Sequence, residues 1–138
     1  MPRTTVTQIV AVHTGDDRVF QAQLGDGLMA RRTADGSVTV HSSRSHDFGL
    51  THALGAPHTL ADWSFALVEP LGAAELLVLA TDGVSEDLEP GRIGDLAAWV
   101  ADDLGVLPHP ARALARELRN WPVPHHRDDK TLLVMWQP

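Results

Sequence analysis

The sequence contains no cysteine and few basic residues, 11 among 138. The absence of cysteine excludes disulfide bonds and any metal site built on thiolates. It also fits a reducing compartment, so we expect the protein in the cytoplasm. With 18 acidic residues the formal net charge is -7, and the basic footprint of a nucleic-acid-binding or lipid-binding protein is missing. We therefore expect no nucleic acid among its partners.

Long apolar runs are also missing. No stretch reaches the roughly 18 apolar residues that a membrane-spanning helix needs, and no apolar signal core follows the first five residues. The composition is that of an ordinary globular protein, with 43% hydrophobic and 21% charged residues. A chain of 138 residues is long enough for one domain with a buried core. The totals predict a soluble domain without a membrane partner.

The first half of the chain has the pattern of β-strands. An apolar run at 76–80 is typical of a strand buried on both faces, and the Asp35-Gly36 pair is a strong hairpin signal. The polar segment 42–59, rich in Gly and His, indicates a loop. Apolar alternation or β-branched runs predict the other strands at 6–13, 19–24, 28–33, 38–40 and 63–67.

The second half changes to a helical period. Apolar residues at 93–104 predict one helix that ends at Gly105. Pro108 and Pro110 predict the start of a second helix, whose apolar positions are Ala111, Leu114, Ala115 and Leu118. A last strand is expected at 131–136. Strands followed by a helical pair predict an α+β fold with mainly antiparallel sheets, one of them covered by the helices.

Two acidic segments adjoin these strands. Asp82 follows the buried strand, where a side chain is held rigidly, and Gly83 permits a sharp turn. Asp128 and Asp129 precede the last strand, and their mutual repulsion could be offset by a divalent cation with hard oxygen ligands or by Arg127 and Lys130. Each segment also has a plainer interpretation: Asp82 as a turn residue, and the second segment as a solvated charged turn.

Taken together, these segments resemble the closing motifs of PPM-type (type 2C) metal-dependent Ser/Thr protein phosphatases. The matching segments are LLVLATDGVS at 76–85 and, after two helical segments, RDDKTLLV at 127–134. Upstream, LGDG at 24–27 resembles the family's G-D-S-R segment and THALG at 51–55 its T-x-x-L-G. The resemblance covers nearly the whole chain. It implies a β-sandwich of two antiparallel sheets with flanking helices, and a chain that is one partial phosphatase domain over 1–138, lacking the N-terminal strands.

The resemblance implies a reaction and a set of residues. Family members use two Mn²⁺ or Mg²⁺ ions and a bridging water to hydrolyse phosphoserine or phosphothreonine in a phosphoprotein, so a Ser/Thr kinase or its target is a candidate partner. No catalytic side chain beyond the metal ligands is implied for this chain. Matched residue by residue, the resemblance implies that Asp82 and Asp128 are metal ligands. It further implies that Asp26 and Glu86 bind an additional metal ion, and that Gly83 and Asp129 lie behind the ligands and support them.

The sequence also departs from the family pattern. The family's early acidic ligand, its D-G-x-G segment, its phosphate-binding Arg and its proton-donating His have no counterpart here, and Gly27-Leu28 replaces Ser-Arg. Two carboxylates alone cannot fix two metal ions around a nucleophile. Three interpretations stay open: a truncated reading of a longer gene, a chain completed by self-association or by a second polypeptide, and a catalytically inactive pseudophosphatase that acts as a regulatory binding module for a kinase or phosphatase.

Other chemistry has weaker support. The eight His residues lack the spacing of zinc ligands, and Ser45 and Ser85 lack the context of a nucleophile elbow. The four tryptophans lie on apolar faces and are expected in the core or as helix anchors. They are Trp63, Trp99, Trp121 and Trp136.

Overall fold

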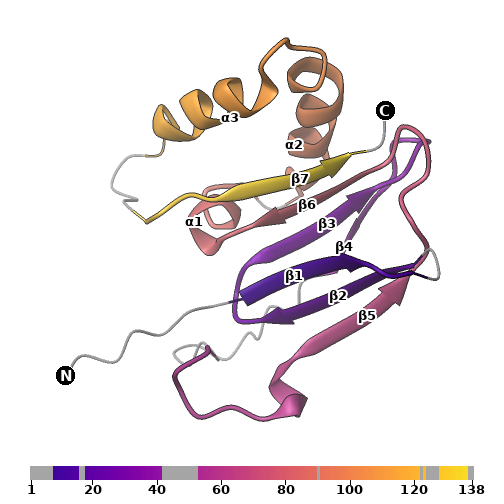
Figure 1. The fold of residues 1–138 in the computed structure, drawn as a ribbon. Coiled ribbons are helices and arrows are strands. Elements are labelled where there is room, and N and C mark those ends of the chain that lie inside the picture. Colours follow the sequence, from indigo (N-terminus) through magenta and orange to yellow (C-terminus); the bar gives the residue numbers. More distant parts are fainter. Residues whose placement is uncertain are drawn as a thin grey trace.

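Two antiparallel sheets form the body of the molecule (Figure 1). The computed structural model describes residues 8–15, 18–41, 53–89, 91–121, 123 and 128–136. In this part of the chain one sheet has the order β1-β2-β5 and the other the order β4-β3-β6-β7. The strands are β1 (Gln8–His13), β2 (Val19–Leu24), β3 (Leu28–Arg32), β4 (Val38–Val40), β5 (Ser64–Val68), β6 (Leu76–Ala80) and β7 (Leu132–Trp136).

Strand β6 lies at the centre of the four-stranded sheet, and all five of its residues are buried. Leu77 and Leu79 pack between the two sheets with Val19 and Met29. Alternate residues of β6 lie on the other face of the sheet, where they pack against the helices. The predicted strand with two buried faces is therefore confirmed, since each face is covered by a different layer.

Helices cover the outer face of the four-stranded sheet. They are α1 (Asp82–Ser85), α2 (Ile93–Trp99), the π-helical η2 (Val100–Leu104) and α3 (Pro110–Arg119); a short 3₁₀ turn, η1 (Leu60–Asp62), precedes β5. Figure 1 shows α2 and α3 lying over β6 and β7. The core on this side consists of Leu76, Val78, Leu96, Ala97, Val100 and Leu104. The α+β sandwich expected from the sequence is the observed fold.

The helical half differs from expectation in three details. The helix predicted over 93–104 is α2 continued by η2, whose last turn widens because the Gly105 N–H donates to the Val100 carbonyl at 2.9 Å. Helix α1 was not predicted, since four residues show no helical period. The predicted apolar face of α3 is partly wrong: Ala111 and Ala115 are exposed, whereas Ala113 and Leu114 pack on the core. A single methyl group drives little burial, so the larger leucine sets the rotation of the helix.

The outer face of the three-stranded sheet carries apolar side chains that face solvent. The alternation predicted for β5 is confirmed, but its apolar residues Phe65 and Leu67 are 51% and 53% exposed, with Val12 at 48% and Phe20 at 37% on the neighbouring strands. Val12, Phe20 and Leu67 are paired in one cross-strand row, and the Phe20 and Phe65 rings stack at 6.1 Å. We call these four residues the outer apolar face. Figure 1 shows no described helix over this sheet.

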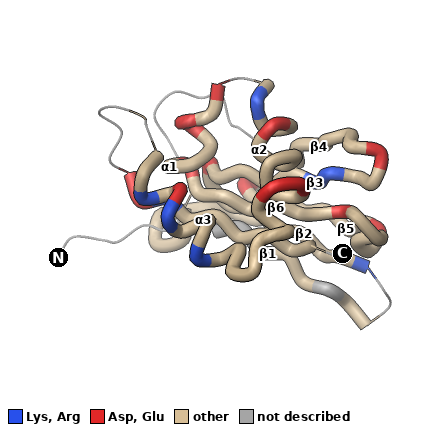
Figure 2. The backbone as a smooth tube through the Cα atoms, turned by 90° about the horizontal axis from the view of Figure 1, so that it is seen from above, with Lys and Arg blue, Asp and Glu red and all other residues tan. Residues whose placement is uncertain are grey.

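Charge is dispersed over the molecule. In the coloured part of the tube in Figure 2, Lys and Arg positions are scattered among acidic ones and form no continuous stripe. Among the helices that the described residues form, none has the length and apolar character needed to cross a membrane. Most of the loop expected at 42–59, with Thr51 and His52 of the T-x-x-L-G match, lies outside the described residues, as does Arg127.

Candidate active site

The predicted acidic residues meet at one end of the four-stranded sheet. In the observed register Leu28 of β3 pairs with Ala80 of β6, and Ala80 pairs with Leu132 of β7. Because β6 is antiparallel to both neighbours, the start of β3, the end of β6 and the start of β7 lie side by side. Asp26 precedes β3, Asp82 follows β6, and the Asp128-Asp129 segment precedes β7. The fold thus gathers four predicted residues from three distant parts of the chain.

The closest approach is between Gly83 in α1 and the segment before β7. A Cβ atom at Gly83 would lie 2.5 Å from the Asp129 carbonyl oxygen and 3.2 Å from the Asp128 Cβ, so only glycine fits. This contact brings the backbone at Asp82, the residue before Gly83, close to the segment that carries Asp128. Both residues predicted to support the ligands, Gly83 and Asp129, therefore lie at the junction of the two acidic segments. The metal-binding role of Asp82 and Asp128 stays a prediction.

The Thr81 side chain also joins the two segments. Its hydroxyl donates to the Asp129 carbonyl at 3.1 Å and accepts the Thr131 N–H at 3.0 Å, while its own N–H donates to the Thr131 carbonyl at 3.0 Å. The hydroxyl extends the β6–β7 pairing to the residues that carry the carboxylates. Sequence reasoning missed this role, although a hydroxyl residue directly before Asp82 was the available signal.

Lys130 forms a buried ion pair on the other side of the junction. Its Nζ lies 2.7 Å from Asp87 Oδ2, with side chains 12% and 2% exposed, and donates to the Gly83 carbonyl at 2.8 Å. The sequence suggested Lys130 as a partner for Asp128 and Asp129, but its close contacts tie the end of α1 to the start of β7. Asp87 was not foreseen, because nothing in the sequence relates it to a lysine 43 positions later.

Asp26 lies in the turn that carries the chain from β2 to β3. Gly25 has a φ of +104°, which favours glycine. The buried Gln23 side chain donates through Nε2 to the Gly25 carbonyl at 3.2 Å and to the Gly27 carbonyl at 2.6 Å. These bonds fix the turn and with it the position of Asp26 at the sheet end. The positioning role of Gln23 was not predicted.

The carboxylates also take part in local structure. Asp82 Oδ1 accepts the Gly83 N–H at 2.8 Å, a bond within the first turn of α1. Glu86 is exposed at the end of α1, where its N–H donates to the Asp82 carbonyl at 2.8 Å.

The donor set is of the right kind for Mg²⁺ or Mn²⁺, because carboxylates are hard oxygen ligands. It is incomplete: within the described ranges no group of three or more Asp, Glu or His side chains is placed to hold one metal ion. Asp82 and Asp128 therefore fit part of a metal coordination shell and do not by themselves form a two-metal centre.

Comparison with known proteins gives one family. The model of the family described as protein phosphatase 2C matches residues 2–121, whereas no curated protein matches. Several solved phosphatase structures have the same fold. PppA, a regulatory component of the type VI secretion system of Pseudomonas aeruginosa, is 20% identical, with a TM-score of 0.65 over 93% of this chain and 55% of that one.

Two further structures are similar. The catalytic domain of the Ser/Thr phosphatase PstP in complex with two manganese ions is 17% identical, with a TM-score of 0.61 over 94% of this chain and 57% of that one. The phosphatase domain of the Bacillus subtilis cell fate determinant SpoIIE is 18% identical, with a TM-score of 0.54 over 94% and 57%. The chain thus spans little more than half the length of these structures. Because the family model covers most of its residues, the chain belongs to the protein phosphatase 2C family.

Proposed function

We propose that this chain provides part of a metal-dependent phosphatase that hydrolyses phosphoserine or phosphothreonine in proteins. The observation that carries the proposal is the junction of Asp82-Gly83 with Asp128-Asp129 at one end of the sheet. That junction lies in a protein phosphatase 2C fold, and a similar structure is a Ser/Thr phosphatase with two manganese ions. This activity fits a cytoplasmic signalling protein that dephosphorylates a kinase or the target of a kinase.

The residues at the junction have distinct parts in this proposal. Asp82 and Asp128 hold a divalent cation, Mn²⁺ or Mg²⁺, and Asp26 and Glu86 support a further ion. A bound ion of this kind lowers the pKa of water and neutralises charge on a phosphate group. Gly83 lets the two ligand segments approach each other. The bonds of Thr81 and Lys130 hold the segments in place before any metal binds, which reduces the ordering that binding requires.

We further propose that additional polypeptide completes the domain. The outer apolar face is an aromatic and aliphatic surface of the kind that marks a protein contact, and the carboxylate set at the sheet end is incomplete. A second copy of the chain or a separate polypeptide that covers this face could also bring the missing acidic ligands.

Light scattering at rising protein concentration tests self-association. The wild-type chain should associate and Leu67→Gln should not, whereas Leu60→Gln, an exposed leucine outside the face, should behave as the wild type. If all three chains stay monomeric, self-association is wrong.

Phosphate release from a phosphothreonine peptide tests the activity. If self-association completes the site, the purified chain, assayed with Mn²⁺ and with EDTA, should show turnover that needs the metal. Asp82→Asn and Asp128→Asn should each reduce it at least about a hundredfold, because loss of a ligand should cost no less than the roughly 10–100-fold loss that follows when a residue supporting a ligand is changed. Asp103→Asn removes the same charge from an exposed position of η2 and should retain activity. Unchanged turnover in Asp82→Asn would contradict the assignment.

The second candidate function is that of an inactive regulatory module. It is favoured because, within the described part of the chain, no group of three or more acidic or His side chains is placed to hold one metal ion. A folded chain that captures a kinase or phosphatase in a stable complex, with no metal-dependent turnover, would support this alternative.

A further inference from the structure

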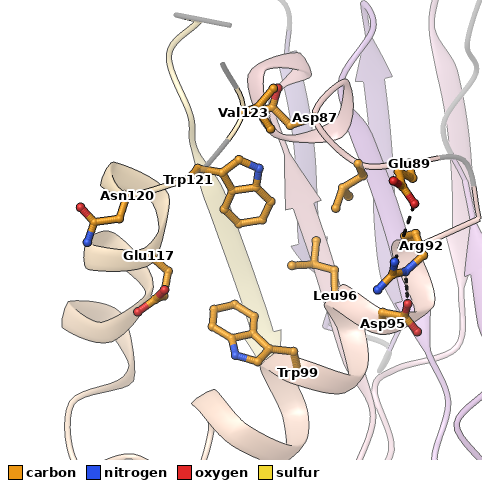
Figure 3. A pocket seen from close by; sticks show the side chains of 11 residues that line it. Asp87, Glu89, Arg92, Asp95, Leu96, Trp99, Glu117, Asn120, Trp121 and Val123 are labelled. Atoms are coloured by element: carbon orange, nitrogen blue, oxygen red, sulfur yellow. Dashed lines mark hydrogen bonds and ion pairs between the residues drawn. The ribbon is translucent and has the colours of Figure 1, made fainter. Parts of the chain in front are cut away.

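A pocket lies between α2 and α3 (Figure 3), on the helical side of the four-stranded sheet. Its volume is about 530 Å³, within the usual range of ligand pockets. It is lined by Asp87, Leu88, Glu89, Arg92, Asp95, Leu96, Trp99, Glu117, Asn120, Trp121 and Val123. We call it the α2–α3 pocket.

Two tryptophans dominate the pocket. Trp99 ends α2 and Trp121 follows α3, and neither is fully buried. Figure 3 shows the two indole rings one above the other along the pocket, with Glu117 of α3 on one side and Leu96 of α2 on the other. Both pack against the core on the helical side, as expected from the sequence. Both also line the pocket, so part of each side chain is accessible to a ligand.

The charge of the pocket favours a cation. Its lining contains four carboxylates, those of Asp87, Glu89, Asp95 and Glu117, and one guanidinium, that of Arg92. Arg92 is shared between Glu89 and Asp95, so one positive charge faces two negative ones. Asp87 is already paired with Lys130. Among the described residues, Glu117, 44% exposed, pairs with its chain neighbour Arg116, an arrangement that contributes little in water.

We propose that the α2–α3 pocket binds an arginine side chain within a basic segment of a partner polypeptide. A guanidinium is planar and weakly hydrated, so it stacks on indole faces and can donate two hydrogen bonds to one carboxylate. In the pocket it lies against Trp99 and Trp121 and donates to Glu117. The volume leaves room for neighbouring residues of the segment. This binding uses no residue of the predicted metal set and does not depend on phosphatase activity.

Calorimetric titration of the full chain with short amidated peptides tests the proposal. The probe is acetyl-Ala-Arg-Arg-Ala-amide, and the matched control contains citrulline, which has the shape of arginine without its charge. The arginine peptide should bind at least about tenfold more tightly than the citrulline peptide, the size expected from a desolvated cation–aromatic contact. Equal binding of the two peptides would overturn the proposal, and so would equal binding of a lysine peptide, since a simple charge would then suffice.

Variants locate the binding. Glu117→Gln should weaken the arginine peptide about fivefold and Trp121→Leu about tenfold, the range of charge-assisted and cation–aromatic contacts. Asp103→Asn, with the same loss of charge at an exposed position outside the pocket, should leave the affinity unchanged. Glu117→Gln alters an exposed side chain and keeps the test independent of folding. If Glu117→Gln and Asp103→Asn have equal effects, binding follows only the net charge of the chain and the proposal is wrong.

Discussion

Gly83→Ala is expected to separate the two acidic segments. The added methyl carbon would lie 2.5 Å from the Asp129 carbonyl oxygen, so the atoms must move apart by at least 0.5 Å to reach the 3.0 Å below which Cβ contacts essentially never occur. Overpacking of this kind costs about 1–3 kcal/mol. The shift also strains the hydrogen bond from Thr81 Oγ1 to the same carbonyl, which adds about 1 kcal/mol. We expect the free energy of unfolding to fall by about 2–4 kcal/mol.

Urea denaturation followed by circular dichroism measures this loss, and Gly94→Ala is the matched control. Gly94 lies in α2, where an added Cβ would meet no atom within 4 Å. Alanine there should stabilise the chain by about 0.5–1 kcal/mol, the ordinary difference between the two residues in a helix. The two substitutions add the same atom and should move the urea midpoint in opposite directions. If Gly83→Ala is as stable as the wild type, the junction is looser than described and its role in bringing the Asp82 and Asp128 segments together is refuted.

Two further predictions concern charged groups. Lys130→Met should lower the free energy of unfolding by about 3 kcal/mol because it removes the ammonium group that pairs with the buried Asp87 carboxylate. Asp87→Leu added to it should restore much of the loss, and equal urea midpoints for the single and double variants would contradict this. A hydrogen bond from the Gly72 N–H, and then the Arg31 guanidinium, hold the pKa of Glu75 below its ordinary 4.5. The contribution of Glu75 to the free energy of unfolding is therefore present above about pH 4.5 and is lost as pH falls through the folded pKa. Glu75→Gln should make the urea midpoint fall less steeply as the pH is lowered. Parallel pH curves for the variant and the wild type would refute this role of Glu75.

The strands were predictable because each carries its signal within a few residues. The alternation in 63–67 and the unbroken apolar run in 76–80 correspond to β5 and β6, and the Asp35-Gly36 hairpin has the expected positive φ at Gly36. The direction of the alternation could not be predicted. Phe65 and Leu67 face solvent because their side of the three-stranded sheet is uncovered in the described part of the chain, and coverage is a property of the layers rather than of the strand.

The site was predictable only in part, for a related reason. Asp82 and Asp128 stood out because both adjoin apolar strands, and the structure brings their segments together at Gly83. The contacts that place them there link residues 43–50 positions apart, from Lys130 to Asp87 and from Thr81 to Asp129 and Thr131. No local pattern in the sequence relates such residues. Gln23 is a different case, since its bonds to Gly25 and Gly27 are local, but a glutamine in a strand carries no specific signal for fixing a turn.

Two factors determine how tightly the junction can bind a metal ion: the number of ligands, and how firmly folding holds the segments that carry them. Thr81, Gly83 and Lys130 fix the ends of β6 and β7 relative to each other through backbone atoms and a buried ion pair, and none of these contacts involves the carboxylates of Asp82 or Asp128. The position of the two backbone segments that carry these carboxylates is therefore set by folding, and it does not wait for an ion. If the chain alone binds Mn²⁺ weakly, we expect the cause to be the number of ligands rather than disorder of the segments that carry them, because preorganised segments lose little entropy on binding. Supplying further acidic ligands should then raise the affinity without changing the stability of the β6–β7 junction.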